Sequence, residues 1–168
     1  MKPVTQKIVQ LAFAALAVVA VAAPTDEGID VSHIVDQAQA ASILGEPVKP
    51  LAPRNMHGDD GYYSKCNYYS AKSKKTLIIR VYQAGAGFDP QKELDAISAS
   101  TGTGRALSGL GDKAQLFSGT ENGLPAHVTM LYVIKGTALV TVGLSGVDEE
   151  DAMEKAKTLA QKVLGQLP

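Results

Sequence analysis

The chain has 168 residues, with 16 Lys and Arg against 17 Asp and Glu, and one cysteine. A formal net charge of −1 excludes a strongly basic nucleic-acid-binding protein and a highly charged disordered chain. Hydrophobic residues make up 45% of the sequence, a share that is usual for a globular protein. One cysteine cannot form an intramolecular disulfide, so a small disulfide-stapled fold is also excluded.

The N-terminus has the pattern of a secretory signal peptide. Lys2 and Lys7 precede an apolar run, Ile8–Ala23, that contains no charge. This run is shorter than the roughly 20 residues that a helix needs to cross a bilayer. Ala20-Val21-Ala22 has the small-x-small pattern at which signal peptidase cleaves.

Three segments are therefore predicted. Residues 1–22 form the signal peptide, residues 23–29 a flexible leader, and residues 30–168 a single domain. Cleavage leaves 14 basic and 17 acidic residues and no stable membrane span. The mature protein is then exported, either to the periplasm or as a secreted protein. The alternative is that the apolar segment is retained as a membrane anchor.

The first part of the domain is predicted to be a helix, a loop and a hairpin. Apolar residues at spacings of three and four predict a helix over 29–44, capped by Asp30 or Ser32. Residues 46–62 contain three prolines and two glycines, which favour a loop. Alternating patterns then predict two paired strands over 63–70 and 76–83.

The second part begins with another helix, for which Asp89 is the predicted cap and Pro90 lies in the first turn. Glycines then favour turns on either side of a short strand. The later elements are this strand at 113–117, a hairpin of strands at 127–134 and 137–144, and a final helix at 148–164. This order predicts an α+β fold, with an antiparallel sheet and helices packed on one face.

Three stretches support a resemblance: Ala40–Val48, Cys66-Asn67-Tyr68 at the start of the hairpin, and Leu107–Ala114. Together they resemble a family of small exported domains of unknown function, many of which are actinobacterial cell-envelope lipoproteins. The resemblance covers roughly residues 30–167. It implies a PsbP-like α+β sandwich and a non-catalytic envelope domain, and it carries over no catalytic residues because the family has none established.

The chain departs from that family in its cysteines. Members often have a second cysteine on the first helix, which pairs with the hairpin cysteine. Here that region offers Ile34, Val35 and Ala38, so Cys66 has no such partner. The lipidated cysteine after the apolar segment is missing too.

Tyrosines are concentrated in the hairpin, with four between positions 62 and 69 and Tyr82 on the next strand. Strand alternation places Arg80 and Tyr82 on an outer face together with either Tyr69 or Tyr68. Rings beside cations predict a surface for an envelope protein or a glycan, so Tyr69, Arg80 and Tyr82 are the candidate binding residues. The alternative is that the rings fill the core and the nearby lysines keep the hairpin soluble.

Two other functions start from single residues. His57 lies in the stretch Met56–Asp60, with Cys66 farther on, and this cluster could bind copper through Met, His and Cys or zinc through Asp and His. The closely spaced ligand pairs of real metal sites are missing. Cys66 could act as the nucleophile of a thiol enzyme, with His57 or His127 as its base. Its strand position instead favours a buried thiol, and a lone cysteine in an exported protein also allows an intermolecular disulfide.

The sequence contains no motif for a hydrolase triad, a phosphate loop or a dinucleotide site. We therefore predict that the protein is not an enzyme and uses no cofactor. Its expected role is to bind a partner in the cell envelope.

Overall fold

A computed structural model of the chain describes residues 28–122 and 124–168. The predicted signal peptide and residues 23–27 of the predicted leader lie outside the described residues. Ile29, at the end of that leader, is half-buried against the core, and its N–H donates to Gln83 Oε1 at 2.6 Å.

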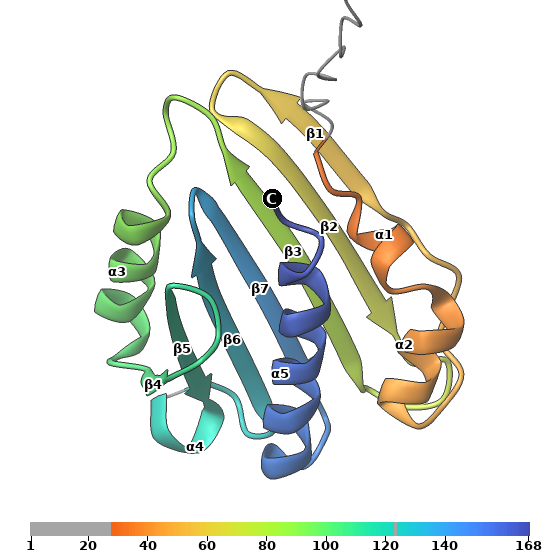
Figure 1. The fold of residues 1–168 in the computed structure, drawn as a ribbon. Coiled ribbons are helices and arrows are strands. Elements are labelled where there is room, and N and C mark those ends of the chain that lie inside the picture. Colours follow the sequence, from red (N-terminus) through yellow and green to blue (C-terminus); the bar gives the residue numbers. More distant parts are fainter. Residues whose placement is uncertain (1–27, 123) are drawn as a thin grey trace, which may run out of the picture.

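Seven strands form one antiparallel sheet in the order β1-β2-β3-β7-β6-β5-β4 (Figure 1). The expectation of an antiparallel sheet with helices is therefore confirmed. The strands are β1 (Arg54–Gly58), β2 (Gly61–Tyr69), β3 (Thr76–Ala84), β4 (Arg105–Leu107), β5 (Lys113–Ser118), β6 (Val128–Lys135) and β7 (Ala138–Ser145). The helices are α1 (Val31–Ile34), α2 (Gln37–Leu44), α3 (Pro90–Thr101), α4 (Gly119–Asn122) and α5 (Glu149–Leu164).

One face of the sheet, the core face, carries the main hydrophobic core. Leu77, Ile79 and Val81 alternate along β3 and are completely buried there. Helices α1, α2 and α5 cover this face (Figure 1). Helix α5 starts at Asp148, whose carboxylate accepts a hydrogen bond from the Glu150 N–H, as expected for an N-cap. Its buried stripe consists of Ala152, Ala156, Leu159, Ala160, Val163 and Leu164.

The opposite side of the sheet, the second face, is also covered in part by a helix. The expectation that all helices pack on one face is therefore wrong. Leu94 of α3 is fully buried in a separate cluster with Phe117, Ile134 and Leu139. Since Leu131 of β6 points into the main core, alternation places Ile134 on the other side of the sheet. Helix α3 therefore lies on the second face.

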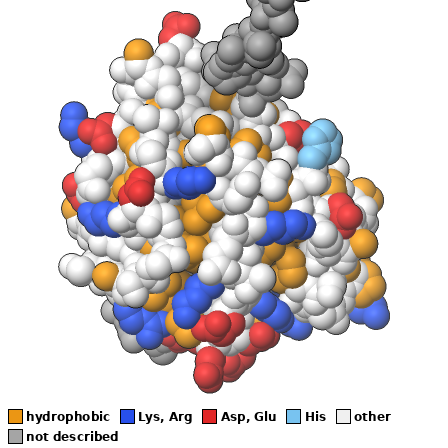
Figure 2. All heavy atoms as spheres, in the orientation of Figure 1, with side chains coloured by type: hydrophobic (Ala, Val, Ile, Leu, Met, Phe, Trp, Pro, Cys, Tyr) orange, Lys and Arg blue, Asp and Glu red, His pale blue; other side chains and the backbone are white. Residues whose placement is uncertain are grey.

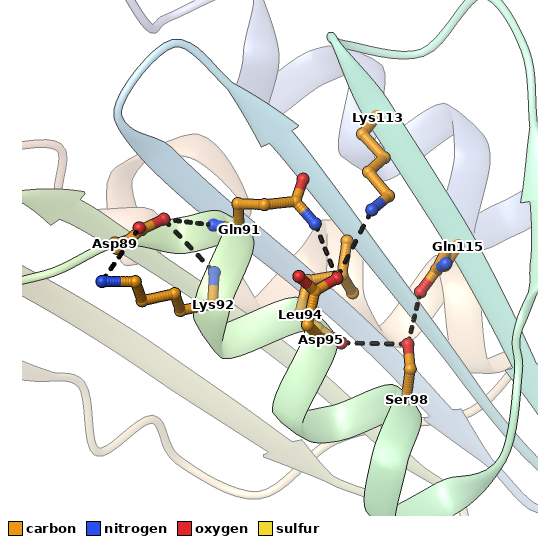
Figure 3. Close-up of polar contacts among 8 residues, drawn as sticks. All are labelled: Asp89, Gln91, Lys92, Leu94, Asp95, Ser98, Lys113 and Gln115. Atoms are coloured by element: carbon orange, nitrogen blue, oxygen red, sulfur yellow. Dashed lines mark hydrogen bonds and ion pairs between the residues drawn. The ribbon is translucent and has the colours of Figure 1, made fainter.

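Polar contacts fix α3 on this face (Figure 3). The Ser98 hydroxyl lies 2.8 Å from Gln115 Oε1 on β5, and Lys113 Nζ lies 3.6 Å from Asp95 Oδ1. The predicted cap is confirmed, because the Asp89 carboxylate accepts hydrogen bonds from the N–H groups at positions 91 and 92.

The short strand β4 and the short helix α4 form in segments that were expected to be turns. Two further element predictions also differ from the structure. The helix expected over 29–44 is broken between α1 and α2, because Asp36 forms a capping box with Gln39 and so starts a new helix. Of the two residues predicted as possible caps, Asp30 and Ser32, it is Asp30 that caps α1. The loop expected over 46–62 contains β1, an edge strand whose residues are all exposed and which therefore lacks the alternation that signals a strand.

Among the helices that the structure describes, none combines the length and the apolar character needed to span a bilayer.

Candidate functional site

Helix α3 packs on β6 and leaves the β1–β3 part of the second face to one side (Figure 1). We call this part the open half. Register and alternation define its members as Arg54 and Met56 of β1, Tyr63, Lys65, Asn67 and Tyr69 of β2, and Thr76, Ile78, Arg80 and Tyr82 of β3.

All three predicted binding residues lie on the open half. In the register of β2 and β3, Tyr69 is opposite Thr76, Lys65 is opposite Arg80, and Tyr63 is opposite Tyr82. The Tyr69 side chain is 48% exposed, whereas Tyr68, the alternative to it, is fully buried in the main core. The structure thus brings Tyr69, Arg80 and Tyr82 to one face, and their role in binding stays a prediction.

Tyr82 belongs to a group of packed rings at one end of the open half. Its ring stacks on that of Phe88 with the ring centroids 3.8 Å apart. The centroid of the Tyr63 ring lies 6.0 Å from that of Tyr82. Burial and a hydrogen bond with Asp60 raise the pKa of Tyr82 from 10.0 to about 12. Tyr82 therefore contributes to packing, in contrast to Tyr69, which is 48% exposed.

A row of three cations crosses the open half, at right angles to the strands. Arg54, Lys65 and Arg80 occupy directly paired positions of β1, β2 and β3. Neighbouring strands lie about 4.8 Å apart, so the row extends across about 10 Å. Like charges directly opposite each other destabilise a sheet. In the described part of the chain, none of the three forms an ion pair with an acid.

Arg80 lies at the boundary between the open half and the region under α3. Beyond it in the same row come Thr141 of β7 and Tyr132 of β6. Burial raises the pKa of Tyr132, and the positive charge of Arg80 opposes that rise, which is consistent with their closeness. The Nε atom of Arg80 is buried and has no hydrogen-bond partner among the described residues.

Two hollows flank the cation row on the surface. One of about 420 Å³ lies at the end near Met56, Tyr63 and Tyr82. The other, of about 230 Å³, is lined by residues that include Lys65 and Tyr69. The open half therefore offers two concavities with cations between them.

Sequence reasoning missed Arg54 as a site residue. It lay in a segment predicted to be loop, so no face could be assigned to it. Once β1 is in register with β2, Arg54 pairs with Lys65 and extends the cation row.

The helix-covered side carries a different feature, a groove between α2 and α5. Figure 2 shows hydrophobic side chains at the surface between charged ones on this side. The groove has a volume of about 430 Å³, and Val35, Ile43 and Leu159 are among its lining residues. Its apolar lining continues the core between the two helices.

The residues of the two alternative functions lie elsewhere. His57 is on β1, and its ring lies 6.2 Å from that of Tyr62. Within residues 28–122 and 124–168, no three His, Cys, Asp or Glu side chains gather closely enough to hold a metal ion.

Cys66 points into the main core and is fully buried. Burial raises the pKa of its thiol, which favours the unreactive protonated form. Beside it, the Tyr68 hydroxyl donates a hydrogen bond to the Val35 carbonyl. The sheet also places β3 and β7 between Cys66 and β6, the strand that His127 precedes. This environment favours a structural role for the cysteine.

The chain matches no family model, and no curated protein matches it.

Proposed function

We propose that the protein is an exported, non-catalytic cell-envelope domain that binds an envelope partner through the open half of its sheet. One observation carries the proposal. Tyr69 and Met56 are large hydrophobic residues that are 48% and 44% exposed, and both lie on this surface beside cations that form no ion pair among the described residues. Exposed aromatic and Met side chains mixed with Arg are typical of binding surfaces.

Export is proposed from the N-terminal sequence, in which two lysines precede a short apolar run and a cleavage pattern. A PsbP-like sandwich is proposed for the fold. It is supported by an antiparallel sheet with helices on both faces. Binding is favoured over thiol catalysis because Cys66 is buried, and over metal transport because His57 has no neighbouring ligand set in the described residues.

The test compares variants of the mature protein in binding to an isolated envelope fraction. Met56→Ser with Tyr69→Ser alters the open half at two exposed positions, and Tyr82 is left intact because it packs against other rings. The control, Ser42→Ala with Thr158→Ala, alters the groove on the opposite side. Binding should fall in the first variant only.

Circular dichroism and thermal unfolding establish that both variants fold like the parent. If the folded open-half variant retains all the partners of the parent, this surface is not the functional one. Equal loss in both variants would also count against the proposal.

A further inference from the structure

We propose that the ligand of the open half is a polyanionic glycan, a polysaccharide with carboxylate or phosphate groups along its chain. Arg54, Lys65 and Arg80 bind these charges, and the exposed ring of Tyr69 binds the sugars. The inference rests on the proposed function, because it names the partner class for the same surface.

The open half carries a concentration of positive charge. Three cations on adjacent strands repel one another, and the row is basic although the whole chain is slightly acidic. An anionic ligand that spans the row relieves the repulsion at all three positions. Since arginine matches the geometry of carboxylates and phosphates with two hydrogen bonds, the row can bind either anion.

The nearby acids lie outside the row, one at the β1–β2 turn and one beyond Arg80. Asp60, in the turn between β1 and β2, is close enough to Tyr82 to affect its pKa. On the other side Glu93 of α3 acts on Tyr132, beyond Arg80. Because Asp60 also lines the hollow of about 420 Å³, the charges of a polyanion are favoured along the row and its uncharged sugar parts in that hollow.

The exposed tyrosine of the open half favours a ligand that contains sugars. A sugar ring has an apolar face and polar edges, which match the flat ring and the hydroxyl of an exposed tyrosine such as Tyr69. Asn67 lies on β2 between Lys65 and Tyr69 and donates to the Tyr69 hydroxyl at 2.9 Å. Its Oδ1 is buried and has no partner among the described residues.

The size of the hollows suits the units of a sugar chain. The hollow of about 420 Å³ is within the range of small-molecule sites, about 300–1,000 Å³, and the hollow of about 230 Å³ is somewhat smaller. Two small concavities on either side of a charged row suit successive units of a flexible chain.

The experiment measures binding of the mature protein to defined polymers by calorimetry or biolayer interferometry. Polygalacturonate provides carboxylates and phosphorylated dextran provides phosphates. Methyl-esterified polygalacturonate and plain dextran are their neutral counterparts. Polyglutamate and phosphatidylglycerol vesicles represent an acidic protein and an anionic membrane.

The main variant is Arg54→Gln with Lys65→Gln, and the matched control is Lys155→Gln with Lys157→Gln. Both remove two positive charges, but the control residues are on α5, over the core face. Arg80→Gln is measured separately because Arg80 is partly buried. Removal of one exposed ionic contact weakens binding about threefold, so we expect about tenfold for the main variant and less than twofold for the control.

We expect at least one anionic polysaccharide to bind at least tenfold more tightly than its neutral counterpart, with affinity that falls as salt is added. The main variant should unfold at the same temperature as the parent or higher, because it removes like-charge repulsion.

Equal weakening by the control variant, or tighter binding of polyglutamate or vesicles, would overturn the inference. If no polysaccharide binds while Met56→Ser with Tyr69→Ser still abolishes binding to the envelope fraction, the glycan inference fails and the proposed function stands. If that variant also keeps its envelope binding, both fail.

Discussion

The second hydrophobic cluster provides a quantitative test of where α3 lies. Leu94 is fully buried between α3 and the sheet. Replacement of a buried Leu by Ala costs about 2–5 kcal/mol, depending on how well the site can close around the cavity. The partners Ile134 and Leu139 are 7% and 6% exposed, and Ile97 is only half-buried, so the site can relax. We therefore expect Leu94→Ala to lower the free energy of unfolding by about 2–3 kcal/mol.

The assay is urea unfolding followed by circular dichroism, together with thermal unfolding and amide hydrogen exchange. For a domain of this size, 1 kcal/mol corresponds to about 3–5 °C, so the Tm should fall by about 6–15 °C. Exchange should increase most in α3, the element that loses its contact with the second face. Ala99→Ser, at an exposed position of the same helix, should change stability by no more than about 0.5 kcal/mol.

A loss below about 1 kcal/mol together with unchanged exchange in α3 would refute the reasoning. It would mean that α3 does not pack on the second face and that this face is open along its whole width. The boundary of the proposed binding surface would then have to be redrawn.

Three further predictions concern single side chains. Tyr68→Phe should destabilise the protein by about 1–3 kcal/mol in urea unfolding, because it leaves the buried Val35 carbonyl without its hydrogen bond; a neutral effect would contradict that contact. The pKa of Tyr82 is near 10 in the unfolded chain and about 12 in the folded protein. The stability that protonated Tyr82 contributes is therefore complete below about pH 10 and is lost as the pH rises towards 12. In unfolding curves, the free energy of unfolding should fall less steeply at alkaline pH for Tyr82→Phe than for the parent. Cys66 should react with a thiol reagent only after denaturation, as measured by mass spectrometry, and rapid labelling of the folded protein would show that the cysteine is accessible.

The strands of the core could be predicted because one strong period governs them. In β3, Leu77, Ile79 and Val81 alternate with residues that are less buried. The predicted pairing of this strand with the one before it, β2, is present in the structure. Caps at Asp30 and Asp89 were predictable for a similar reason, since short acidic side chains before apolar periodic runs satisfy free backbone N–H groups.

The side on which α3 packs could not be predicted. Its stripe, Leu94 and Ile97, shows that the helix has an apolar side, but β6 is apolar on both faces through residues such as Leu131 and Ile134. Either face of the sheet could therefore accept the helix. The chain gives no local signal that decides between them.

The candidate site was predictable in part for a related reason. Tyr69, Arg80 and Tyr82 lie on strands with clear alternation, so their common face followed from the pattern. Arg54 lies on an exposed edge strand, where pairing with β2 rather than periodicity determines the structure. The cation row depends on that long-range pairing and could not be seen in the sequence.

The order of the strands also has a consequence for how the protein folds. Strands β1–β3 and β4–β7 are two meanders, each built from consecutive antiparallel neighbours, and they meet only where β3 pairs with β7. That seam joins residues such as Gln83 and Ala138, which are roughly 55 positions apart, so its formation carries the largest loop-closure entropy in the sheet. Helix α5 packs on β6 and β7, and the second meander therefore has its own helix to cover it. We expect this meander to form first and to act as the template on which the first meander, with the binding surface, is completed; pulse-labelling hydrogen exchange in which β2 is protected before β6 would show the opposite order.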